Sequence, residues 1–196
     1  MNATAADRIL TTHAGSLPRH ETLSGLLIRR EEGEGVDAAE LAREMDGAVA
    51  RVTARQAECG VDIANDGEQQ RVGFSTYIAQ RMEGFGGESK RRRSRDYEEF
   101  PELVEVLARR FPHRSRMQNA PQAQGELRYR GASAIAGEIE RLKRSVPTDA
   151  FSGCFLTAPS PGIVSTTMLN AYYDSHESYL AALAREMRHE YHTRPA

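Results

Sequence analysis

The amino-acid sequence predicts an α/β fold with about four parallel strands and flanking helices, in a sheet that does not close into a barrel. Short β-prone runs alternate with segments of helical periodicity along the 196-residue chain. A long helical segment joins the first two runs, which makes their strands parallel. A closed eight-fold β/α barrel typically takes about 250 residues, with roughly 200 as its lower limit. We therefore expect one open domain over residues 1–196, whose uncovered sheet edges favour self-association.

The first strand–helix–strand unit fills the N-terminal third of the chain. Residues 9–12 are a β-prone run, and residues 13–19 contain the glycine and proline of a loop. Asp37 can cap a helix, with a glutamate three positions later, and Gly60 follows the helix end. Residues 61–65 read as the second strand. The apolar stripe of the helix recurs at spacings of three and four, at Leu41, Met45, Ala48, Val49 and Val52.

The alternation continues through the rest of the chain. The expected segments are a loop rich in glycine and charge over 84–100, a helix over 102–111, a strand over 125–129, a helix over 134–144, a strand over 154–158, and a last helix from 174 or 175 to 191.

Composition excludes several classes of function. The 26 basic and 28 acidic residues give a net charge of -2, so we expect no nucleic-acid partner, and the basic run 90–93 reads as part of a solvated loop. No apolar stretch is long enough to span a membrane, and the first residues lack a secretory pattern, which predicts a cytoplasmic protein. Cys59 and Cys154 form no CxxC motif, and we expect both to be buried.

Familiar catalytic signatures do not occur. The chain has no phosphate-binding P-loop, no dinucleotide-binding glycine motif after a strand and no G-x-S-x-G elbow. His189 and His192 are three positions apart, whereas the zinc-protease helix needs its histidines four apart. We expect no metal site in this chain.

Two polar loops remain as the candidate site. Parallel strands of one sheet end at the same face, so the 13–19 loop and the 66–68 loop should meet there. Ser16 follows Gly15, and its hydroxyl and the nearby amides suit a carboxylate. Asp66 and Glu68 suit an ammonium group or a proton relay. Together the loops could clamp a free α-amino acid, although both could equally be solvated turns.

These loops also carry a family resemblance. The run 11–19, TTHAGSLPR, and the run 66–71, DGEQQR, resemble the first two strand-end loops of the cobalamin-independent methionine synthase family. The resemblance extends from Arg8 to about Tyr191. Further matches to the smaller, methionine-synthase-like branch are 74–77, 129–131, 158–162, 172–173 and 176–179.

The resemblance implies a fold and a reaction. The fold would be the first half of a (β/α)8 TIM-type barrel. The reaction would be the zinc-dependent transfer of a methyl group from methyltetrahydrofolate, with its polyglutamate tail, to the sulfur of homocysteine, the zinc holding that sulfur as a thiolate. Carried over by position, Ala14, Gly15 and Ser16 would hold the substrate carboxylate and Glu68 its ammonium, with His13, Arg19 and Asp66 as further substrate-binding candidates and Arg116 and Met117 near the folate.

The sequence departs from the family at the metal. The family's zinc ligands, a His-x-Cys pair, a glutamate and a later cysteine, have no counterpart here, and Cys59 and Cys154 do not match them. We therefore expect a chain that carries the amino-acid-binding loops without the metal. Two alternatives stay open: a non-catalytic half-barrel that acts as an interaction module, and a related alkyl transferase with a different thiol acceptor.

Overall fold

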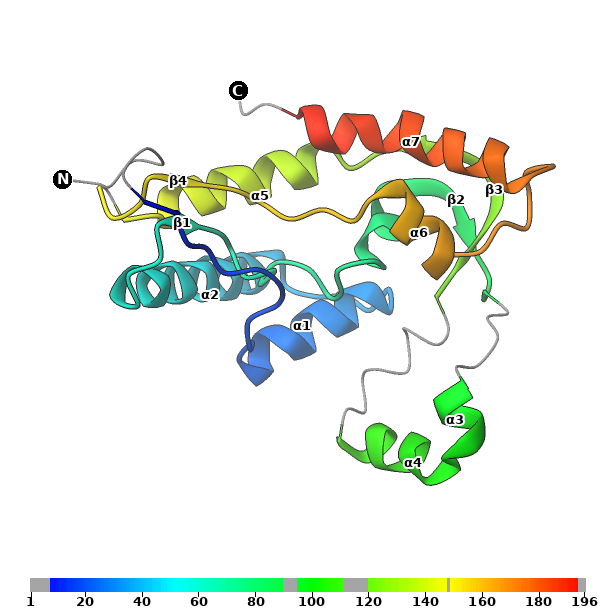
Figure 1. Ribbon diagram of the computed structural model, residues 1–196, viewed down its shortest axis with the longest axis horizontal. Coiled ribbons are helices and arrows are strands. Elements are labelled where there is room, and N and C mark those ends of the chain that lie inside the picture. The colour runs from blue at the N-terminus through cyan, green and yellow to red at the C-terminus, as the bar shows by residue number, and fades with distance from the viewer. Residues whose placement is uncertain (1–7, 90–94, 111–119, 148, 194–196) are drawn as a thin grey trace.

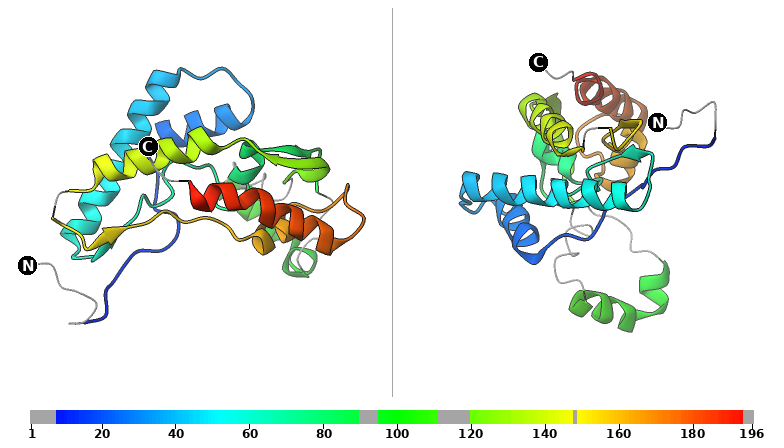
Figure 2. Two further views of the ribbon diagram at one scale, coloured as in Figure 1. Left: turned by 90° about the horizontal axis from the view of Figure 1, so that it is seen from above. Right: turned by 90° about the vertical axis from the view of Figure 1, so that its left-hand side faces the viewer.

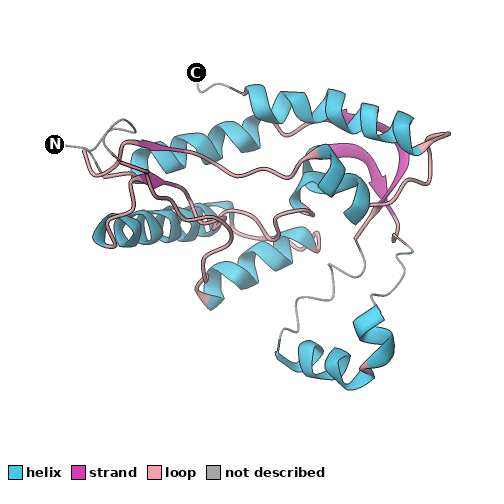
Figure 3. Ribbon diagram, viewed as in Figure 1, coloured by secondary structure: helices cyan, strands magenta, loops and turns pink. Residues whose placement is uncertain are grey.

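The computed structural model describes residues 8–89, 95–110, 120–147 and 149–193 (Figure 1). Its helices and strands alternate along the chain (Figure 3). In order, the elements are α1 (Glu21–Glu31), α2 (Ala38–Glu58), β1 (Ile63–Ala64), the 3-10 helix η1 (Tyr77–Arg81), β2 (Met82–Gly86), α3 (Arg95–Glu99), α4 (Pro101–Arg110), β3 (Gln122–Tyr129), α5 (Ala132–Ser145), β4 (Gly153–Cys154), α6 (Pro161–Thr167) and α7 (His176–His192).

Three short segments make a small parallel sheet that stays open. β1 pairs in parallel with β4, and Thr12 forms an isolated parallel bridge with Ile63 on the other side of β1. The predicted strands at 9–12 and 154–158 are thus in place but much shorter than expected. α1 and α5 both pack against α2, which connects the first two segments (Figure 2). The arrangement is a partial barrel of α/β type that does not close.

The segment expected as the third parallel strand belongs elsewhere. β3 pairs antiparallel with β2, so the prediction of four parallel strands is wrong at this point. The predicted loop over 84–100 is also wrong in part, because it contains the end of β2 and all of α3. Gly84, with φ +95°, lies at an irregularity in the pairing, and an added Cβ would approach the Glu126 carbonyl oxygen to 2.6 Å. A glycine that usually marks a loop here permits a close approach of two strands.

Most predicted helices are confirmed, and their ends follow ordinary capping rules. The Asp37 side chain accepts hydrogen bonds from two backbone amides at the start of α2, and Ser175 forms a capping box at the start of α7. Besides α3, two helices were missed. α1 buries Leu23, Leu26 and Leu27, a helical spacing that the sequence does show. α6 is capped by Ser160, within a proline- and glycine-containing run that reads as a loop.

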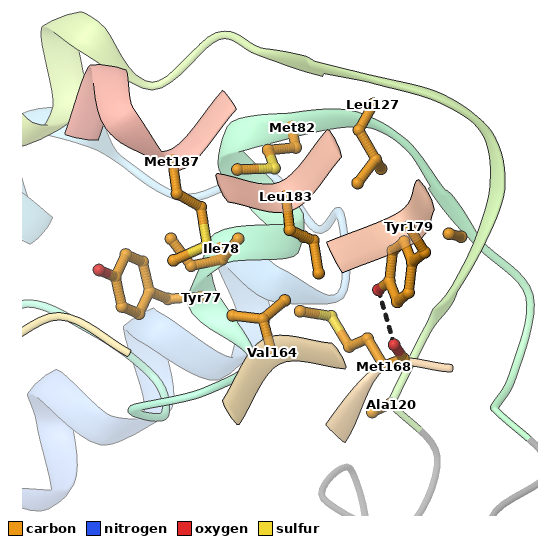
Figure 4. Close-up of a cluster of buried hydrophobic side chains, with 11 residues drawn as sticks. Tyr77, Ile78, Met82, Ala120, Leu127, Val164, Met168, Tyr179, Leu183 and Met187 are labelled. Atoms are coloured by element: carbon orange, nitrogen blue, oxygen red, sulfur yellow. Dashed lines mark hydrogen bonds between the residues drawn. The ribbon is translucent and has the colours of Figure 1, made fainter. Parts of the chain in front are cut away.

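The larger hydrophobic core lies where η1, the antiparallel pair, α6 and α7 meet (Figure 4). Tyr179 is fully buried in it, and its hydroxyl donates a 2.7 Å hydrogen bond to the Met168 carbonyl. A second cluster joins α1 to α2. Both cysteines are exposed, so the expectation that they are buried is wrong. Among the described helices, none is long and apolar enough to cross a membrane. The buried residues of the larger core are Tyr77, Ile78, Met82, Ala120, Ala123, Leu127, Val164, Met168, Tyr179, Leu183 and Met187.

Candidate functional site

Hydrogen bonds to backbone carbonyls hold the two candidate loops together. The Leu17 amide donates to the Gly67 carbonyl over 2.9 Å. The Asn65 side chain donates to the His13 carbonyl over 2.5 Å, and the Gln69 side chain donates to the Leu17 carbonyl over 2.8 Å. The loops therefore meet at the ends of their parallel strands, more than forty positions apart in the sequence.

Unusual backbone conformations shape this meeting point. Gly15 has φ +100° and Gly67 has φ +57°, and a Cβ on Gly67 would lie 2.8 Å from Leu17 Cδ1. Glu68 also has a positive φ, 58°, which is rare for a residue with a side chain. The Glu68 amide is held by a 3.0 Å hydrogen bond to Asp66 Oδ1. Strained conformations of this kind cluster at binding and catalytic sites.

The Glu68 carboxylate contacts both the first loop and the segment after β4. The Ser16 hydroxyl donates to Glu68 Oε2, and the Thr157 hydroxyl donates to Oε1 over 3.2 Å. Glu68 is only 4% exposed, whereas Ser16 is exposed. In the part of the chain that the structure describes, the carboxylate has no ion-pair partner. It is thus a buried anion held by two neutral hydroxyls.

The other predicted residues take different positions. Asp66 is buried and accepts a 3.0 Å hydrogen bond from the side-chain amide of Gln70, and burial raises the pKa of Asp66. Arg19 donates to the Glu68 carbonyl over 2.6 Å, and burial lowers its pKa against the opposing charges of Glu68 and Asp66. His13 Nε2 lies 3.0 Å from the Gly15 carbonyl, and Ala14 is exposed beside it. The positions of Arg116 and Met117 lie outside the described residues.

A buried charge network adjoins the loops and was not predicted from the sequence. Glu138 accepts from Arg71 Nε at 3.0 Å and from Nη2 at 2.7 Å, and it also pairs with Arg81. Arg81 pairs in turn with Glu190, which accepts a 3.0 Å hydrogen bond from the Tyr77 hydroxyl. The Arg71 and Arg81 guanidinium carbons lie 4.2 and 4.4 Å from the centre of the Tyr77 ring. These long-range pairs leave no local sequence signal, because their partners are 57 to 113 positions apart.

Arg71 connects this network to Glu68. Its Nη1 donates to the Thr157 carbonyl, and the Thr157 hydroxyl donates to the Glu68 carboxylate. Thr157 is therefore a site residue that sequence analysis missed. The signal was available, because Thr157 falls in the predicted strand 154–158, which runs parallel to the strand before Glu68.

The side chains that the structure describes do not fit a zinc site. Protein zinc is held by cysteine, histidine and carboxylate side chains grouped around the ion. Among residues 8–89, 95–110, 120–147 and 149–193, no three such side chains are grouped to hold a metal ion.

Comparison with known proteins agrees with the fold. The family model described as cobalamin-independent synthase, catalytic domain, matches residues 9–127. A B12-independent methionine synthase from Shewanella sp. W3-18-1, solved with selenomethionine, superposes with a TM-score of 0.60 at 19% identity, over 92% of this chain and 46% of that one. A protein from Listeria monocytogenes assigned as a vitamin-B12-independent methionine synthase superposes with a TM-score of 0.57 at 17% identity, over 96% of this chain and 51% of that one.

The chain spans about half the length of these two structures. No match is found among curated proteins. The family match covers more than half of the present sequence and includes both candidate loops. The chain belongs to the cobalamin-independent methionine synthase family.

Proposed function

We propose that this chain carries the amino-acid-binding part of a methionine-synthase-like S-methyltransferase, with homocysteine or a related thiol as the acceptor. The proposal rests on the surroundings of the Glu68 carboxylate, which is buried and has no ion-pair partner among the described residues. A buried carboxylate is costly unless it is paired, and here its partners are two neutral hydroxyls. An ammonium group on a ligand would supply the missing positive charge. The selenomethionine in the Shewanella structure supports a ligand of this class for the fold.

The two loops divide the ligand between them. The ammonium would take Glu68 Oε2, where the Ser16 hydroxyl now donates. Ser16 would then be free to donate to the ligand carboxylate, together with the amides around Ala14 and Gly15. The positive φ of Gly15 and its missing side chain let the backbone approach the ligand closely. The Ser16 hydroxyl would thus exchange its hydrogen bond to Glu68 for one to the ligand carboxylate.

The remaining parts of the family reaction stay separate from this site. We propose methyltetrahydrofolate as the methyl donor, with Arg116 and Met117 near it, on the resemblance stated above. Transfer to a thiol needs the thiolate, because a free thiol with a pKa near 8.5 is mostly protonated at neutral pH. No three zinc-type ligands are grouped among the described residues, so we assign no transfer step to them. Residues 1–196 would form one partial barrel domain.

Calorimetric titration with L-methionine and L-homocysteine tests the binding role. We expect Glu68→Gln to weaken both ligands by about tenfold or more, because it removes the anionic partner of the ammonium. Glu126→Gln is the matched control, since Glu126 is an exposed carboxylate paired with Arg128 at 2.7 Å. Unchanged affinity in Glu68→Gln, with a normal circular dichroism spectrum, would refute the assignment.

A second candidate role is that of an interaction module. The first parallel segment lies at an edge of the small sheet, and Ile9 beside it is 91% exposed. Unpaired edges of this kind favour association with another chain. Sedimentation over a range of protein concentrations tests it: a concentration-dependent dimer supports the module, and a monomer at every concentration contradicts it.

A further inference from the structure

A cavity adjoins the Ser16–Glu68 contact, between the first loop and α2, the two segments that run close together in Figure 1. Its volume is about 580 Å³. Neither Ser16 nor Glu68 lines it. The lining residues of the loop side and of the α2 side include His13, Leu17, Pro18, Arg19, His20, Ala48, Arg51, Val52, Arg55 and Gln56.

The charges around this cavity are of one sign. Three arginines and two histidines line it, and no aspartate or glutamate does so among the described residues. The chain as a whole carries a net charge of -2, so the composition does not account for this grouping. Leu17, Val52 and Val61 provide an apolar part of the wall. A cavity with an apolar wall and a few converging charged groups is the usual form of a small-molecule site.

Arg19 supplies a donor that lacks a partner. Its Nη2 donates to the Glu68 carbonyl, which fixes the guanidinium, while its Nε is buried with no hydrogen-bond partner among the described residues. A buried donor without an acceptor costs free energy that an acceptor would recover. Burial also lowers the pKa of Arg19, against the opposing charges of Glu68 and Asp66. An oxyanion bound at Arg19 Nε would accept the missing hydrogen bond and stabilise the buried positive charge.

Arg51 and Arg55 bring two further guanidinium groups to the same wall. They are four positions apart on α2, so they project from one face of the helix. Arg55 is held by Glu58 at 2.8 Å, whereas Arg51 has no hydrogen-bond or ion-pair partner within the described part of the chain. Arg51 therefore brings a guanidinium without a partner to the cavity that Arg19 also lines.

We propose that this cavity is a binding site for a small organic oxyanion, a carboxylate or a phosphate ester with a short apolar portion. The oxyanion would bind Arg19 and Arg51, and the apolar portion would lie on Leu17 and Val52. Guanidinium groups suit both anions because their donors match the geometry of two oxygen atoms.

Titration with butyl phosphate, hexanoate and inorganic phosphate at constant ionic strength tests this site, followed by amide chemical shifts of α2 and the first loop. We expect saturable binding of butyl phosphate or hexanoate, with weaker binding of inorganic phosphate, which lacks the apolar portion. Arg51→Gln should weaken binding about fivefold or more. Arg185→Gln on α7, also an exposed helical arginine, should leave it unchanged.

Two results would overturn the proposal. One is the absence of saturable shifts with all three anions, in a protein whose spectrum shows it folded. The other is binding that Arg51→Gln and Arg185→Gln weaken equally, because that would reflect general charge attraction. Arg51 is exposed, so its substitution leaves the fold intact and the comparison stays interpretable.

Discussion

Two buried carboxylates in this protein have opposite surroundings. Glu138 is paired with Arg71 at 2.7 Å and with Arg81. Glu68 has similar burial, 4% exposed against 6%, but its carboxylate is held by the hydroxyls of Ser16 and Thr157. The protein neutralises the first charge with two ion pairs, whereas the second has no ion pair among the described residues, because the nearby Arg19 donates to the Glu68 backbone carbonyl instead. The difference distinguishes a carboxylate that stabilises the fold from one that is available to a ligand.

The paired carboxylate also joins elements that are distant in the sequence. Glu138 on α5 and Glu190 on α7 are both held by Arg81 at the end of η1. Arg71 reaches from the loop of Glu68 into the same network. Two arginines thus balance two glutamates, and the site loop is fixed to both helices.

Removing the paired carboxylate should have the largest effect. Glu138→Ala leaves Arg71 and Arg81 buried without their shared partner, which we expect to lower the free energy of unfolding by about 3–5 kcal/mol. Urea unfolding measures it. Glu140→Ala on the same helix is the control, because Glu140 is half-exposed and lies 3.8 Å from Lys143. If the two variants lost equal stability, the network would not have the structural role assigned to it.

The turn that carries the unpaired carboxylate should be next in sensitivity. Gly67→Ala puts a Cβ at φ +57° and 2.8 Å from Leu17 Cδ1, and we expect a loss of about 1–3 kcal/mol. Gly60→Ala is the control: its φ is +74° and no atom lies within 4 Å of the added Cβ, so this variant has the backbone strain without the steric contact. Thermal unfolding measures the stability loss of both variants, and the difference between the two losses gives the cost of the Cβ contact with Leu17. A larger loss in Gly60→Ala would contradict the close packing of the two loops.

The unpaired carboxylate itself should matter little for stability. Glu68→Gln keeps a side chain that hydroxyls can bind and removes a buried charge without a cation, so we expect a change within about 1 kcal/mol in either direction. Urea unfolding of Glu68→Gln and Glu138→Ala compares the changes in the free energy of unfolding of the two variants. A loss as large as that of Glu138→Ala would place Glu68 among the structural carboxylates.

A third carboxylate, Asp62, whose arginine partner is half-exposed, should show the smallest effect. Asp62 pairs with Arg8 at 2.8 Å and accepts from Thr11, and the hydrogen bond from Arg8 is the main cause that lowers its pKa to about 2. A lowered pKa in the folded state gives stability above the unfolded value of 3.8, which is lost as the pH falls through about 2. The stability difference between wild type and Asp62→Asn should therefore shrink from pH 5 to pH 2. A difference that is constant over this range would contradict the pairing.

The sequence was most informative where local rules decide the structure. Asp37 marks a helix start that capping predicts, and the meeting of the Ser16 and Glu68 loops follows from the right-handed strand–helix–strand rule. It was least informative where partners are distant. The Arg71–Glu138 pair and the antiparallel pairing of β3 depend on contacts that no local pattern encodes. Gly84 shows the same limit, because its role is set by Glu126 on the opposite strand.

The most direct measurement compares L-methionine with 4-(methylthio)butanoate, the same molecule without its amino group, on wild type and on Glu68→Gln. If Glu68 receives the ammonium, wild type should prefer methionine by about tenfold or more, which is ~1.4 kcal/mol, and Glu68→Gln should bind the two ligands alike. An equal preference for methionine in both proteins would show that another group binds the ammonium.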